Sequence, residues 1–165
     1  MTYHRPVLLQ ECIEGLNINP KGIYVDVTFG GGGHSKEILK HLTTGKLYSF
    51  DRDSDVLENL IEDDNFKLIQ TNYKNIKRFL RLEGVKKVDG ILADLGVSSH
   101  QFDVPERGFS FRFDAELDMR MNVSSELTAR SVLNEYSEGD LANVFFNYGE
   151  IRQSRKAANL IVKYR

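Results

Sequence analysis

The hydrophobic pattern changes its period repeatedly along the first part of the chain. Short runs rich in β-branched and aromatic residues predict four strands, at 23–27, 46–51, 66–70 and 88–94. Between these runs, apolar residues recur every three or four positions, which predicts four helices, over about 6–16, 35–43, 53–61 and 76–84. Strands that alternate with helices of this length are typical of an α/β fold with a doubly wound, mostly parallel sheet.

The pattern changes after Asp94. Phe109, Phe111 and Phe113 alternate with polar residues, which favours a short strand or arm that buries one face. The alternative is an aromatic surface on which an extruded base stacks. Beyond this stretch, helix-spaced apolar residues predict three more helices, over about 128–136, from 137 to 148, and from 151 onward.

The end of the chain carries no helix stop signal. The last predicted helix is still in phase at Ile161 and Val162, and no Gly, Asn or Pro closes it. Four strands are also fewer than a nucleoside-binding sheet of this kind uses. We therefore expect the chain to be the first part of a longer protein, and we expect this part alone to expose apolar surface and a strand edge, so that it is less stable or self-associates.

One stretch, residues 26–35, carries the strongest local signal. The first predicted strand ends there in a carboxylate, and four consecutive glycines, Gly30 to Gly33, lead into a helix. Ordering four glycines is entropically costly, so we expect backbone with positive φ, or a close approach that leaves no room for Cβ. A ligand at the helix N-terminus would explain such an approach, whereas a purely structural turn is the alternative.

The ends of the other strands strengthen the case for a ligand. Asp51 ends the second strand about twenty residues after the glycines, where a carboxylate can accept hydrogen bonds from ribose hydroxyls. Asp94 ends the fourth strand in the same way. In a parallel sheet the carboxyl ends of all strands meet at one edge, so the glycine turn, Asp51 and Asp94 should line one crevice.

Composition excludes several classes of protein. The chain has 165 residues, 28% of them charged, and a net charge of −2, so any contact with nucleic acid must be local. A single cysteine, Cys12, rules out an internal disulfide framework and is read as core packing. No cluster has the spacing of metal ligands, and we expect no metal site. Residues 1–6 lack a signal-peptide core and no run is long enough for a membrane span, which favours a cytoplasmic protein.

Five blocks of sequence together resemble a known family, the bacterial 16S ribosomal RNA cytosine-N4 methyltransferases of the MraW/RsmH type. These blocks are 26–35, 50–53, 89–99, 106–111 and 117–121. The resemblance implies a class I, Rossmann-like methyltransferase fold that uses S-adenosyl-L-methionine and acts on 16S ribosomal RNA of the small subunit. It also implies a partial methyltransferase core over residues 1–104 and, over 105–165, the start of a helical substrate-recognition insertion, with the family's closing strands missing.

The resemblance implies a set of cofactor contacts. Carried over residue by residue, these contacts fall on Gly32, Gly33, His34, Asp51, Tyr73, Asp94 and Gln101. Tyr73 would place its ring beside adenine, although a core aromatic at a helix start is the alternative. Amino-methyltransferases often carry an acid, two prolines and an aromatic residue after the fourth strand. Here only the acid, Asp94, is retained, so the proton acceptor is left unassigned.

Two other functions stay open at this point. A dinucleotide-dependent oxidoreductase would share the glycine turn and Asp51, but Ser35 stands where its fingerprint has a third glycine. A cofactor-binding fragment without activity is the second alternative. The sequence leaves the oligomeric state open.

The resemblance makes structured RNA the expected partner, recognised through shape and splayed bases. The candidate RNA surface combines two groups of residues. These are Arg107, Phe109, Phe111, Arg112 and Arg120 after the fourth strand, and Arg152, Arg155, Lys156 and Lys163 in the last helix.

Overall fold

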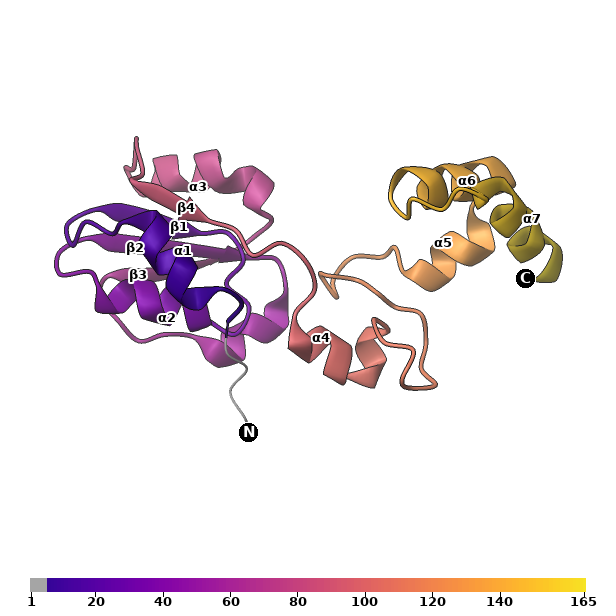
Figure 1. The fold of residues 1–165 in the computed structure, drawn as a ribbon, viewed down its shortest axis with the longest axis horizontal. Coiled ribbons are helices and arrows are strands. Elements are labelled where there is room, and N and C mark those ends of the chain that lie inside the picture. The colour runs from indigo at the N-terminus through magenta and orange to yellow at the C-terminus, as the bar shows by residue number, and fades with distance from the viewer. Residues whose placement is uncertain (1–5) are drawn as a thin grey trace. The chain divides into compact units, whose positions relative to one another are not determined.

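The computed structural model describes residues 6–165 (Figure 1). The chain divides into two compact units, one up to Ser98 and one from Ser99 to Arg165. Within the described residues, no helix is long and apolar enough to cross a membrane.

The first unit is built on a four-stranded sheet in which all strands are parallel. Its strands are β1 (Ile23–Asp26), β2 (Lys46–Asp51), β3 (Phe66–Gln70) and β4 (Gly90–Leu92), in the order β3-β2-β1-β4. This confirms the predicted α/β class and the parallel sheet. Because β2 and β4 lie on opposite sides of β1, the strand order reverses between β1 and β4. Ligands of open α/β sheets bind at the carboxyl ends of the strands near such a switch point.

Helices cover both faces of this sheet, as a doubly wound fold requires (Figure 1). The helices of the first unit are α1 (Leu9–Leu16), α2 (Gly33–Lys40) and α3 (Ile76–Leu82). Alternate residues of β1 point to opposite faces, so Tyr24 packs in the cluster with α1 and α2, and Val25 in the cluster with α3. The helical spacing of apolar residues in the sequence arises because each helix buries one side in one of these two clusters.

The α-helix expected over 53–61 does not form. The segment forms a 3₁₀ helix, η1 (Ser54–Asn59), and Leu60 leaves it in an extended conformation. Of the apolar residues that gave the helical spacing, Leu57 and Leu60 are exposed, and only Val56 within the segment is buried. Asp53 caps the first turn through the amide of Asp55, so the segment is held as a tight turn without a buried face. A second 3₁₀ turn, η2 (Tyr73–Asn75), precedes α3.

The second unit is helical. It contains α4 (Ser99–Asp103), the 3₁₀ turn η3 (Pro105–Arg107), α5 (Ala129–Glu135), α6 (Glu138–Asn147) and α7 (Ser154–Tyr164). The three helices expected after residue 128 are confirmed. Thr128 and Ser137 cap α5 and α6 through their hydroxyl groups, and α6 packs on α7 around the fully buried Leu141 and Ala158.

The strand or arm expected at Phe109–Phe113 is wrong. No strand forms there; a turn begins at Phe111, whose side chain is fully exposed, and Phe113 is also exposed. Alternation failed as a signal because the backbone folds back on itself: Ser110 caps the turn by accepting a hydrogen bond from the amide of Arg112.

Candidate functional site

The carboxyl edge of the sheet brings together several of the predicted site residues. Asp26 is the last residue of β1 and lies opposite Ser49 of β2 and Leu92 of β4. Asp51 is the last residue of β2, and Asp94 follows β4 by two residues. The glycine turn continues from β1 at the same edge. The structure therefore assembles at the switch point the residues that the sequence had placed far apart.

The glycine turn needs glycine at two of its four positions. Gly30 and Gly32 have left-handed backbones, with φ of 49° and 73°, which side chains rarely adopt. A Cβ on Gly32 would also lie 3.0 Å from the ring of Phe29. By contrast, a Cβ on Gly31 would meet nothing within 4 Å. The conformation of the turn thus accounts for Gly30 and Gly32 without a ligand.

Gly33 is required for a different reason from the one the sequence indicated. Its φ is not left-handed, and a Cβ there would collide with the ring of Pro6, so the close approach at Gly33 is made by the N-terminal segment. The amide of Gly32 is also engaged, since it donates to the carbonyl of Phe29 at 2.8 Å. Gly33 begins α2, whose N-terminus has no side-chain cap, and an uncapped helix N-terminus favours an anion.

Asp51 connects the second strand to the glycine turn. Its carboxylate accepts the amide of Gly30 at 2.9 Å through Oδ2 and the amide of Asp53 at 3.0 Å through Oδ1. The residue is half-buried. Each carboxylate oxygen can accept a second hydrogen bond, so Asp51 can hold the turn and still accept from a ribose diol.

The side chain of His34 serves the fold. It is buried, and its Nε2 donates to the carbonyl of Val7 at 3.0 Å, which ties the N-terminal segment to α2. The carbonyl can only accept, so the proton lies on Nε2. The cofactor contact expected at His34 therefore stays a prediction for its backbone amide, in the first turn of α2.

The other predicted contacts differ in their surroundings. Tyr73 lies three residues beyond Gln70, the β3 partner of Asp51, and half of it is exposed, so its ring is no core aromatic. Asp94 is exposed, and its amide donates to the hydroxyl of Thr28 at 2.7 Å. Gln101 lies in α4 of the second unit, where it is buried.

Sequence reasoning missed a buried polar network beneath this edge. Asp26 is fully buried, and its carboxylate accepts the Thr28 amide at 3.0 Å and the Ser35 hydroxyl at 2.7 Å. The hydroxyl of Ser35 also lies 2.8 Å from that of Ser49. Burial raises the pKa of the Asp26 carboxyl, and the bonds from Ser35 and Thr28 oppose that shift only in part.

The network connects α2, which follows the glycine turn, to the residues after β4. Thr28 is the shared member, because its hydroxyl accepts from the Asp94 amide and lies 3.3 Å from Asp26. Ser35 links Asp26 to α2. A carboxylate at the end of an otherwise apolar strand, followed two residues later by Thr, was the available signal in the sequence.

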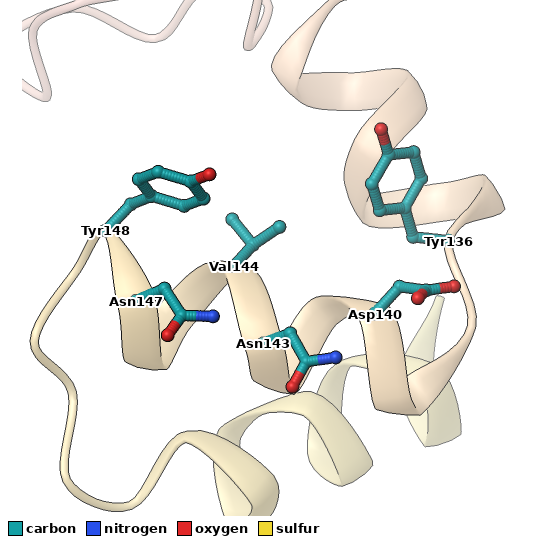
Figure 2. Close-up of a pocket in the computed structure, with 6 residues that line it drawn as sticks. All are labelled: Tyr136, Asp140, Asn143, Val144, Asn147 and Tyr148. Atoms are coloured by element: carbon teal, nitrogen blue, oxygen red, sulfur yellow. The ribbon is translucent and has the colours of Figure 1, made fainter.

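A hollow of about 470 Å³ lies on the second unit and contains none of these residues (Figure 2). It follows one side of α6, with Tyr136 and Tyr148 at its two ends and Asn143 and Asn147 between them. Over residues 6–165, no group of three or more His, Cys, Asp or Glu residues could hold a metal ion.

A parallel α/β sheet with a glycine turn at its switch point and an acid after its second strand defines a nucleoside-binding domain. Comparison with known sequences then gives the family: the chain belongs to the MraW methylase family, whose model matches residues 1–165. This membership favours methyl transfer over the hydride transfer that the glycine turn alone had left open.

Three relatives are each named Ribosomal RNA small subunit methyltransferase H. The one from Flavobacterium johnsoniae is 63% identical over 166 residues, covering 100% of this chain and 55% of the relative. The one from Christiangramia forsetii is 60% identical with the same coverage of both chains, and the one from Cytophaga hutchinsonii is 59% identical over 99% of this chain and 55% of the relative. The chain therefore spans about half the length of the relatives that it matches.

Proposed function

We propose that this chain forms the cofactor-binding part of a methyltransferase that uses S-adenosyl-L-methionine and modifies the N4 amine of a cytosine in 16S ribosomal RNA. The observation that carries the proposal is the carboxyl edge itself, where the Asp51 carboxylate binds the glycine turn beside the uncapped N-terminus of α2. Family membership and the names of the relatives supply the reaction and the substrate.

The residues at this edge fit the proposed cofactor. A carboxylate group such as that of the methionine part suits the first-turn amides of α2, from Gly33 and His34. The remaining lone pairs of Asp51 suit the ribose hydroxyls. The exposed ring of Tyr73, beyond the neighbouring strand, is available to flank adenine. The contact that the resemblance implies for Gln101 stays a prediction.

When bound, S-adenosyl-L-methionine supplies an electrophilic methyl group and leaves as a neutral thioether. The lone pair of a cytosine amine is delocalised into the ring, so the protein must align the amine with the methyl group and accept the departing proton. Asp94 is the candidate acceptor because it is the exposed carboxylate after β4. The hydrogen bond from its amide to Thr28 positions it relative to the buried Asp26 network.

The substrate imposes two further conditions. A base inside a helical stack cannot reach the sheet edge, so the target cytosine must leave its stack. The chain carries a net charge of −2, so RNA must be held by local positive surface. Because the small subunit is the proposed partner, the proposed location is the cytoplasm.

A methyl-transfer assay with the intact protein tests this proposal. Small subunits that lack the modification are incubated with methyl-labelled cofactor, and the digested RNA nucleosides are separated by mass spectrometry. We expect label on the N4 amine of cytidine, and we expect Asp94→Asn, which keeps an acceptor oxygen for the cofactor but cannot take up the proton, to lose most of the transfer. Cofactor binding without any labelled cytidine would leave only the alternative of a binding module, and efficient methylation of free cytidine would refute the RNA substrate.

A further inference from the structure

The charges of the second unit are strongly segregated along the chain. Residues 99–150 contain ten Asp and Glu residues and four arginines. Residues 151–165 contain no acid and five cations, which are Arg152, Arg155, Lys156, Lys163 and Arg165. The last segment is therefore positive although the unit as a whole is not.

Helix α7 turns these cations away from the fold. Ser154 and Ala158 are buried and set the inward side of the helix, which packs on α6. At about 3.6 residues per turn, Lys156 and Lys163 lie on the side opposite this buried pair, and Arg155 lies on the flank. All three are exposed, as is Arg152 just before the helix. We call Arg152, Arg155, Lys156 and Lys163 the α7 basic face.

The arginines earlier in this unit are engaged within the fold. Arg107 is buried and donates to the carbonyl of Arg120, which corrects its assignment to the RNA surface. Arg120 donates to the carboxylate of Asp118 and to the carbonyls of Val123 and Ser125. The remaining two arginines pair with acids, Arg112 with Asp103 at 2.9 Å and Arg130 with Glu116 at 2.6 Å.

The α7 basic face has no such partners. Within residues 6–165, the side chains of Arg152, Arg155 and Lys156 make no hydrogen bond, ion pair or ring contact, and that of Lys163 only lies over the ring of Tyr164, at 5.1 Å. Arg165 differs, because it donates to the carbonyls of Leu133 and Tyr136 at the end of α5.

Two of these cations, Arg155 and Lys156, are also unfavourable for the helix that carries them. The first turn of α7 contains Arg155 and Lys156 and no acid, and no side chain caps its N-terminus. The helix dipole places partial positive charge at that end, where acids stabilise and cations destabilise. The helix dipole therefore gives no reason for cations at Arg155 and Lys156, whereas a polyanionic partner does.

We propose that the α7 basic face binds the phosphate backbone of the RNA substrate. This inference rests on the proposed function and names the surface that the function requires. The proposal assigns the phosphate contacts to α7. It excludes Arg107, Arg112 and Arg120, which the sequence analysis had placed on the candidate RNA surface. From Arg155 to Lys163 the face extends about 12 Å along the helix, at about 1.5 Å per residue, which is long enough to follow successive phosphates.

The test compares two charge-matched double variants of the intact protein. R155Q/K156Q removes two cations of the α7 basic face, and R112Q/R130Q removes two that are paired with acids. Binding of a 16S ribosomal RNA transcript is measured at several KCl concentrations. Each phosphate contact contributes about 0.7–0.9 to the slope of log K against log salt concentration, so R155Q/K156Q should reduce the slope by about 1.4–1.8 and R112Q/R130Q should leave it nearly unchanged.

Three controls separate the possible failures. The melting temperature of R155Q/K156Q should not fall, since the removed charges oppose the helix dipole. If wild-type protein methylates small subunits but both double variants keep the wild-type slope, or only R112Q/R130Q reduces the slope, this inference is wrong and the proposed function stands. If wild-type protein transfers no methyl group, the proposed function fails by itself. Binding to phosphatidylglycerol vesicles that depends on Arg155 and Lys156, with unchanged RNA binding, would make the face a membrane surface and overturn the inference.

Discussion

Replacing Asp51 with alanine should weaken the cofactor site in two separable ways. The substitution removes the acceptor proposed for the ribose hydroxyls, and it removes the two amide hydrogen bonds that hold Gly30 and Asp53. A hydrogen bond to a charged group contributes about 1.5–3 kcal/mol, but Asp51 is half-buried and water can replace part of the loss. We therefore expect the free energy of unfolding to fall by about 1–3 kcal/mol.

The affinity for S-adenosyl-L-methionine should fall by a similar amount. A loss of about 1–3 kcal/mol corresponds to a rise in Kd of about 5- to 150-fold, measured by calorimetry on the intact protein. Asp51→Asn keeps one acceptor oxygen and should lie between wild type and Asp51→Ala. Asp64→Ala makes the same change of charge at an exposed residue before β3, on the opposite edge of the sheet, and should bind the cofactor normally.

A cofactor analogue that lacks a ribose hydroxyl separates the two effects. If Asp51 accepts from the ribose, wild-type protein should bind the deoxy analogue more weakly than the cofactor, whereas Asp51→Ala should bind the two almost equally. The same loss on removing the hydroxyl in both proteins would show that Asp51 holds the turn and does not touch the ribose.

Three other perturbations test the structure by chemical and thermal unfolding. Gly32→Ala should cost about 1–2 kcal/mol because its φ is left-handed, whereas Gly31→Ala should be nearly neutral; equal effects would contradict the geometry of the turn. The hydrogen bonds from Arg120 lower the pKa of the Asp118 carboxyl, so the stability that this pair contributes should be present above about pH 4 and lost as the pH falls further, and Arg120→Ala should abolish that dependence. Burial raises the pKa of Asp26, so the contribution of its ionisation should become less favourable as the pH rises above about 4, and Asp26→Asn should gain stability relative to wild type over that range; a difference that does not vary with pH would contradict the raised pKa.

The fold could be predicted where the apolar residues that set the sequence period are also the residues that are buried. The strands were recognised from short apolar runs because both faces of the sheet are covered, as Tyr24 and Val25 show on β1. The segment at 54–59 was misjudged because Leu57 within it and Leu60 after it are exposed, so their helical spacing does not correspond to a buried face.

The candidate site was predictable in its location and less so in its contacts. Parallel strand topology alone brings Asp51 and Asp94 to one edge. Two features of the site depend on where the N-terminal segment lies, which no local pattern encodes. These are the lack of room for a Cβ at Gly33 and the hydrogen bond from His34 to Val7. The burial of Arg107 likewise depends on the loop around Arg120, so a stretch that reads as a basic surface in the sequence is part of the fold.

Backbone amide hydrogen exchange of the intact protein, with and without S-adenosyl-L-methionine, locates the cofactor on the chain. We expect the cofactor to slow exchange in the glycine turn and first turn of α2, over 30–36, and around Asp51 and Tyr73. We expect no comparable change along α6, where the hollow of the second unit lies. Protection confined to that hollow, or saturating cofactor without any protection at the carboxyl edge of the sheet, would show that the cofactor does not bind at the glycine turn.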